Sequence, residues 1–114
     1  MPLARDLRDK VERRLSQYCE EHIPERVRHR LRLIYKVRGN HVTLIEQRPA
    51  MLDAEKWIDI VVAQFRFRPD DSKWMLYWAD RNSRWHAYDD VGPSSDLEDL
   101  LGEVDRDPTG IFWG

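Results

Sequence analysis

The stretch Lys73-Trp74-Met75-Leu76-Tyr77-Trp78, followed after a short turn by Arg84-Trp85-His86-Ala87-Tyr88, decides the fold of this chain. In both runs apolar residues occupy every second position, which is typical of strands with one buried face. The residues between them, Asp80-Arg81-Asn82-Ser83, have the composition of a turn. The sequence therefore predicts a β-hairpin whose tryptophans face a core.

The length of that turn fixes which side chains share a face of the predicted hairpin. A four-residue turn sets Trp78 opposite Trp85 and Leu76 opposite Ala87, because register follows loop length. A strand is also expected over residues 57–68, joined to the hairpin through Pro69-Asp70-Asp71-Ser72, and it sets Phe67 opposite Trp74 and Phe65 opposite Leu76. In that strand Trp57, Asp59 and Val61 are expected on the same side as Ala63, Phe65 and Phe67. The predicted core face consists of Ala63, Phe65, Phe67, Trp74, Leu76, Trp78, Trp85 and Ala87.

A second hairpin is predicted upstream, about Gly39-Asn40. Leu31, Leu33, Tyr35 and Val37 alternate with more polar positions, and Gly39-Asn40 suits a two-residue type II′ turn. Folding the chain about this turn pairs Val37 with Val42, Tyr35 with Leu44 and Ile34 with Ile45. Apolar residues then lie together in both strands, so the two strands support the same register.

Helices are predicted at both ends of the chain. Leu3, Leu7, Val11, Leu15, Tyr18, Cys19 and His22 recur at helical spacing, and Pro24 ends that helix. Its outer face offers four ion pairs at i,i+4 spacing, which are Arg5–Asp9, Asp6–Lys10, Arg8–Glu12 and Asp9–Arg13.

The C-terminal helix is expected to begin with a capping box of Ser95 and Glu98. Its buried stripe is Leu97, Leu100, Leu101 and Val104. The apolar tail Ile111-Phe112-Trp113-Gly114 is expected to pack in a groove or on a second chain. The whole sequence, residues 1–114, thus predicts a single α+β domain: an N-terminal helix, a five-stranded antiparallel meander sheet, a C-terminal helix and the apolar tail.

Composition narrows the class of protein. The 114 residues are 35% charged and 41% hydrophobic, without an apolar run long enough for a membrane helix or an apolar signal core at the N-terminus. One cysteine excludes an internal disulfide. We therefore expect a cytoplasmic protein with no membrane association.

Charge is distributed unevenly along the chain. Residues 1–40 carry a net charge of +5 and residues 89–114 a net charge of −7, within an overall −2. The basic segment could meet nucleic acid or phosphate. Alternatively, the basic and acidic segments lie near one another in the fold.

The chain resembles a bacterial family known as domain of unknown function 3024. The resemblance runs from about Arg32 to Gly114. It rests on residues 42–49 (VTLIEQRP), 65–67 (FRF), 74–78 (WMLYW), 85–88 (WHAY), Leu97 to Val104 and 107–114 (DPTGIFWG). It implies a small bacterial protein and supplies no activity, cofactor or catalytic residue.

The face opposite the tryptophans offers a candidate site. The predicted register sets Gln64, Tyr77 and His86 side by side, with Arg66, Met75 and Tyr88 in the adjacent row. Tyrosine, histidine and arginine on a sheet can stack bases or hold phosphate. We therefore expect a non-enzymatic module that binds nucleic acid or another anionic ligand through Gln64, Arg66, Tyr77, His86 and Tyr88. The simpler alternative is an ordinary solvent-facing sheet, or one covered by the tail or a second chain.

Two other functional classes remain open. A small hydrolase-like enzyme would use His86 with a loop carboxylate such as Asp53 or Glu55. A structural homodimer would be joined by the tail or by the open sheet face. No catalytic residue is assigned.

Other ionisable groups have structural explanations. Glu46 is expected to pair with Arg48 or to emerge at the rim of the sheet. The segment Asp53-Ala54-Glu55-Lys56 resembles the acid-x-lysine pattern of metal-dependent nucleases, but it falls in a predicted loop. Cys19 and His22 alone do not make a zinc site. We expect no metal and no cofactor.

Overall fold

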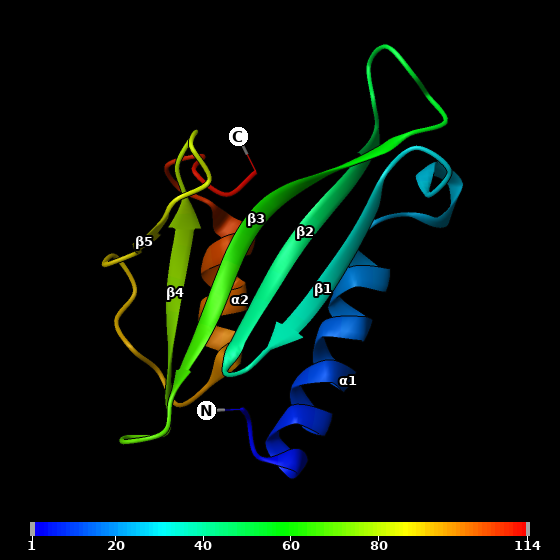
Figure 1. The fold of residues 1–114 in the computed structure, drawn as a ribbon. Coiled ribbons are helices and arrows are strands. Elements are labelled where there is room, and N and C mark those ends of the chain that lie inside the picture. Colours follow the sequence, from blue (N-terminus) through cyan, green and yellow to red (C-terminus); the bar gives the residue numbers. More distant parts are fainter. Residues whose placement is uncertain (1, 114) are drawn as a thin grey trace.

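A computed structural model describes residues 2–113 of the protein and has the α+β architecture expected (Figure 1). The expected end of the tail, Gly114, lies outside the described residues. The elements are α1 (Arg5–His22), the 3-10 helix η1 (Glu25–Val27), β1 (Arg32–Arg38), β2 (His41–Pro49), β3 (Trp57–Arg68), β4 (Lys73–Ala79), β5 (Trp85–Ala87) and α2 (Leu97–Arg106). The strands form one antiparallel meander in the order β1-β2-β3-β4-β5.

The hairpin β1–β2 has the predicted register. Val37 pairs with Val42, Tyr35 with Leu44 and Ile34 with Ile45. Gly39 has a φ of 61°, in the left-handed region that glycine enters without steric cost and that the first central residue of a type II′ turn requires. Glu46 is buried and accepts a hydrogen bond from Arg48 Nε, as expected.

The register of β3 against β4 is also confirmed, with Phe67 opposite Trp74 and Phe65 opposite Leu76. The expectation for the first half of β3 is wrong. A bulge lies where β3 passes Leu44 and Ile45, so Leu44 pairs with Ala63 but Ile45 pairs with Val61. The extra residue, Val62, moves Trp57, Asp59 and Val61 to the face opposite Ala63, since one inserted residue reverses the alternation.

The predicted register of β4 against β5 is wrong by one residue. Trp78 pairs with His86 and Ala79 with Trp85, instead of Trp78 with Trp85. The cause is the turn: Ser83 adopts a left-handed φ of 61° after a tight turn in which its amide donates to the Asp80 carbonyl oxygen. The β4–β5 turn is therefore one residue longer than predicted, and every side chain of β5 points to the face of the sheet opposite to the predicted one. Ala87 is therefore exposed, and neither it nor Trp85 joins the core.

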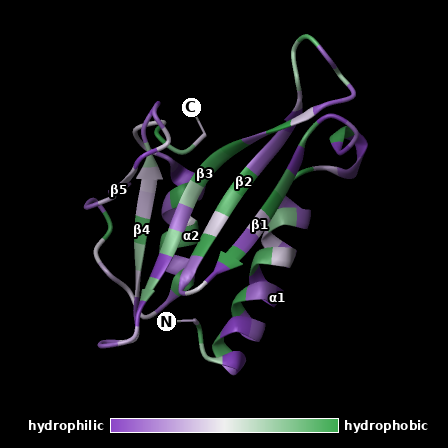
Figure 2. Cartoon of the chain, viewed as in Figure 1, coloured by the Kyte–Doolittle hydropathy of each residue, from purple (hydrophilic) through white to green (hydrophobic). Residues whose placement is uncertain are grey.

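Both helices pack on one side of the sheet and form its second layer (Figure 1). In Figure 2 the hydrophobic residues of α1 lie along one stripe, as the spacing predicts, and Val11, Leu15 and Tyr18 are buried. Arg14 binds Glu98 through two hydrogen bonds of 2.6 and 2.9 Å. The basic N-terminal and acidic C-terminal segments thus meet in the fold.

Capping of α2 differs from the prediction by one residue. Asp96, not Ser95, is the N-cap, and its carboxylate accepts from the Glu98 amide at 3.0 Å. Ser94 donates instead to Asp99. The predicted stripe of Leu97, Leu100, Leu101 and Val104 is buried.

The apolar tail packs on its own chain, on the helix side of the sheet. Phe112 is buried against Tyr88, with ring centroids 5.1 Å apart. The Trp113 indole donates to the Val104 carbonyl oxygen at 2.9 Å and stacks on His22 at 4.5 Å. Within the described residues, no helix combines the length and apolarity that crossing a membrane requires.

Candidate functional site

The sheet face opposite the helices is the candidate site, and its composition follows from the strand registers. Side chains alternate between the two faces of a strand, so residues paired across strands share a face. One outward row runs Lys36, Thr43, Gln64 and Tyr77, and the next runs Arg38, His41, Arg66 and Met75. We call this surface the basic face. Its cationic residues are Arg32, Lys36, Arg38, Arg66, Arg68 and Lys73.

Carboxylates are scarce on the basic face. Among the described residues that the registers place outward in β1–β4, Asp59 is the one acidic residue. Its Oδ2 lies 3.9 Å from Lys36 Nζ. Asp71, in the β3–β4 loop, pairs with Arg68. The remaining cations of this face form no ion pair within 4 Å with the described residues. An uncompensated positive surface of this kind attracts anions.

Arg66 is held in place by a chain of contacts across three strands. Thr43 on β2 accepts a hydrogen bond from Gln64 Nε2 at 2.9 Å, and Gln64 Oε1 accepts from Arg66 Nε at 2.6 Å. The Arg66 guanidinium then lies 3.8 Å from the centre of the Tyr77 ring on β4. These contacts use Nε and one planar face of the guanidinium, which leaves its terminal nitrogens available to an anion.

His41 is the titrating group beside this arginine. It pairs with Arg66 across β2 and β3. Burial lowers the pKa of His41 below its ordinary value, and the positive charge of Arg66 lowers it further. The imidazole is therefore neutral at neutral pH, and an anion bound at Arg66 would favour its protonation.

A second arginine–aromatic stack lies at the far end of the basic face. The guanidinium of Arg32 on β1 lies 3.9 Å from the ring centre of Trp57, the first residue of β3. Gln47, which pairs with Arg32, lies opposite Asp59 of β3 and donates a hydrogen bond of 2.9 Å to its carboxylate. The bulge in β3 creates this arrangement, because it turns Trp57 to the outer face.

The structure brings together three of the five residues predicted for the site. Gln64, Arg66 and Tyr77 lie side by side as expected. His86 and Tyr88 do not join them, because the longer turn places both on the helix side of the sheet. His86 stacks on Trp78 with ring centroids 4.7 Å apart, and Tyr88 is buried.

His86 has a carboxylate partner, but neither of the two suggested by the sequence. Asp80 Oδ2 lies 2.7 Å from His86 Nε2, while its Oδ1 accepts from the amides of Asn82 and Arg84. The hydrogen bond from His86, followed by the Arg84 amide, lowers the pKa of Asp80 to about 2. These bonds close the β4–β5 turn. The loop with Asp53 and Glu55 joins β2 to β3 at one end of these strands, away from β5 (Figure 1).

The remaining candidates have structural roles. Burial raises the pKa of the Cys19 thiol to about 11, so it is not a reactive thiolate. His22 is exposed and stacks on Trp113. Among residues 2–113, no three histidine, cysteine or acidic side chains cluster as metal ligands would.

Sequence reasoning missed His41, Thr43 and the pair of Arg32 with Trp57. Thr43 and His41 could have been found by extending the β1–β2 register to β3, since they lie opposite Gln64 and Arg66. The Arg32–Trp57 stack needed the bulge, which alternation alone does not reveal.

Comparison with known proteins gives a family and no activity. The family model described as "Domain of unknown function (DUF3024)" matches residues 4–114. No curated protein and no solved structure matches the chain significantly.

Proposed function

Because the chain belongs to the DUF3024 family, whose description names no activity, we propose a function from the geometry: the basic face binds single-stranded nucleic acid. One observation carries the proposal. Uncompensated cations lie on an open sheet next to two rings already stacked by arginine, Tyr77 and Trp57. Single-strand binders combine a positive surface that follows the phosphates with planar groups on which bases stack.

The basic face is a sheet surface that no helix covers (Figure 1), which favours a single strand over a duplex. Duplex DNA is read by helices or strands that enter a groove, whereas unpaired bases can lie flat on a sheet. Arg66 would contact phosphate through its terminal nitrogens, and Tyr77 and Trp57 would contribute stacking surface at the two ends of the face.

Electrostatics also argue against the homodimer alternative on this surface. A two-fold dimer sets the same patch of both copies together. On the basic face six cationic residues would meet six others, with Asp59 as the outward-facing acid of each copy. Like charges brought together at an interface are unfavourable.

We expect Arg66→Gln to weaken binding of a fluorescent oligonucleotide of about twelve nucleotides by roughly tenfold, because it removes a phosphate contact from a preorganised position. Fluorescence anisotropy over about 50 to 200 mM salt measures this, and the slope of log K against log salt should become shallower by about one. The matched control is Arg13→Gln, an exposed residue on α1 with the same loss of charge. The proposal fails if the wild type does not bind at the lowest salt, or if the two variants lose affinity equally.

We expect the affinity to rise as the pH falls from about 7.5 to 5.5, because the folded protein holds His41 neutral and a bound phosphate favours its charged form. His41→Gln should flatten this dependence and leave the affinity at the higher pH nearly unchanged. Anisotropy titrations at fixed ionic strength check it. A wild-type profile that the His41→Gln variant reproduces would show that another group is responsible.

A further inference from the structure

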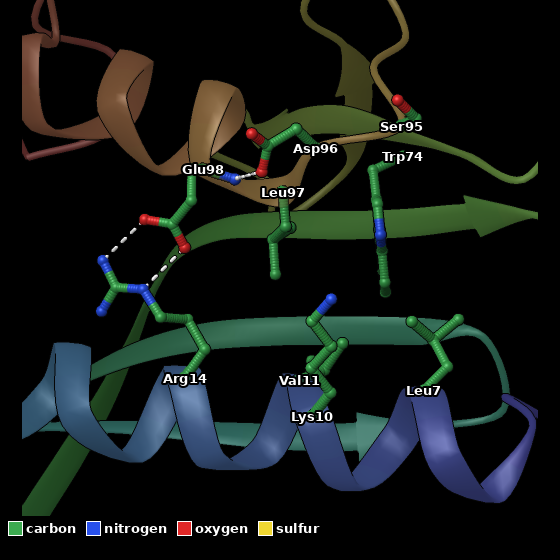
Figure 3. Close-up of a pocket in the computed structure, with 9 residues that line it drawn as sticks. All are labelled: Leu7, Lys10, Val11, Arg14, Trp74, Ser95, Asp96, Leu97 and Glu98. Atoms are coloured by element: carbon green, nitrogen blue, oxygen red, sulfur yellow. Dashed lines mark hydrogen bonds and ion pairs between the residues drawn. The ribbon is translucent and has the colours of Figure 1, made fainter.

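A cavity of about 350 Å³ opens on the other side of the molecule, between the two helices. Leu7 and Val11 of α1 form one wall, Leu97 of α2 forms the other, and the Trp74 side chain from the start of β4 lies at one end (Figure 3). The volume is at the lower end of the range for small-molecule sites. Most of the surface that lines the cavity is apolar, although five of the nine lining residues are polar or charged, so the cavity suits a compact hydrocarbon body with a polar end.

Four charged side chains border this cavity, and three of them already have a hydrogen-bond partner in the fold. Arg14 and Glu98 bind each other through two hydrogen bonds and close one end (Figure 3). Asp96 is engaged as the N-cap of α2 by the Glu98 amide. The fourth is Lys10, which forms no ion pair within 4 Å with the described residues, its predicted partner Asp6 included.

Lys10 is placed to meet a ligand. Its side chain extends from α1 into the space between the helices, so that its ammonium lies beside the apolar walls (Figure 3). We propose that this cavity binds a small carboxylate with an apolar body, whose hydrocarbon part contacts Trp74, Val11 and Leu97 and whose carboxylate pairs with Lys10. The site is on the helix side of the sheet and does not depend on the proposed function of the basic face.

Octanoate and its uncharged counterpart 1-octanol test both parts of the proposal by isothermal titration calorimetry. The wild type should bind octanoate with a Kd of about a millimolar or tighter, and 1-octanol more weakly. Lys10→Gln should weaken octanoate binding about three- to fivefold, as expected for a solvent-accessible charge pair, and leave 1-octanol unaffected. Arg13→Gln, which removes a charge from an exposed residue of α1 that does not line the cavity, should change neither.

Leu7→Trp tests the hydrocarbon part, because the larger ring occupies the cavity from a half-exposed position and can be accommodated without loss of the fold. It should weaken both compounds while the circular dichroism spectrum stays that of the wild type. Absence of saturable octanoate binding, equal affinity for the two compounds, or equal effects of Lys10→Gln and Arg13→Gln would each overturn the proposal.

Discussion

Replacing Tyr88 by alanine is expected to destabilise the protein by about 3–5 kcal/mol, the usual cost of removing a buried aromatic ring. Tyr88 is 6% exposed, packs on Phe112, and donates to Glu103 at 2.7 Å. The loss therefore combines a cavity with a buried carboxylate deprived of a donor. Urea denaturation, followed by circular dichroism, measures it.

Tyr88→Phe separates the hydrogen bond from the ring. Glu103 keeps Arg106, whose Nη2 lies 2.6 Å away, so we expect the lower end of the cost of a bond to a charged group, about 1.5 kcal/mol. The Tyr88 hydroxyl, followed by Arg106, holds the pKa of Glu103 below its ordinary value. Because this pKa is lower in the folded protein than in the unfolded chain, the interactions of Glu103 stabilise the fold at a pH above its ordinary pKa of 4.5. That stabilisation is lost as the pH falls through the folded pKa. The difference between wild type and Tyr88→Phe should therefore shrink below about pH 4.

Tyr77 is the matched control for this experiment, because the sequence alone places both tyrosines on one face. Tyr77→Ala should cost stability only about 1 kcal/mol, from the half-exposed stack with Arg66, and should weaken oligonucleotide binding. Tyr88→Phe should leave that binding unchanged. Similar stability costs for Tyr77→Ala and Tyr88→Ala would mean that the two side chains share a face after all, and that our register for β5 is wrong.

The two tyrosines also show where sequence patterns suffice. Two conditions let alternation predict the β1–β2 and β3–β4 registers. Each connecting turn admits one favourable length, as where Gly39 accepts the positive φ of a two-residue turn. In addition, a shift of one residue in either strand pair would bury charged residues. At the β4–β5 turn neither condition holds. Both registers bring aromatic residues together, Trp78 with Trp85 in one and Trp78 with His86 in the other, so the pattern does not choose between them.

The choice at that turn is made by hydrogen bonds to one side chain. Asp80 accepts from two backbone amides and from His86, which favours the longer turn with Ser83 in the left-handed conformation. Aspartate at the start of a turn is a known signal for such local bonds, but the third bond, to His86, depends on the register itself. The bulge at Val62 is a similar case, since an apolar residue can be buried on either face of β3.

Asp107 is the position where a single side chain fixes the tail, and alanine there is expected to cost about 2–4 kcal/mol. Asp107 ends α2 in the left-handed region, with a φ of 40°. Its two carboxylate oxygens accept from the amides of Phe112 at 3.0 Å and Trp113 at 2.9 Å. Alanine is strained in that conformation and leaves both amides without their acceptor.

Three substitutions at Asp107 divide this cost into its parts. Asparagine tolerates the left-handed conformation and keeps one acceptor oxygen, so Asp107→Asn should cost about 1 kcal/mol. Glycine relieves the strain but offers no acceptor, so Asp107→Gly should fall between asparagine and alanine. Urea denaturation gives the order, and hydrogen exchange of the amides of residues 111–113 should quicken in the same order. If alanine and glycine are equally destabilising, the backbone conformation contributes nothing; if Asp107→Gly keeps the stability of the wild type, the carboxylate is not what holds the tail against Tyr88 and Val104.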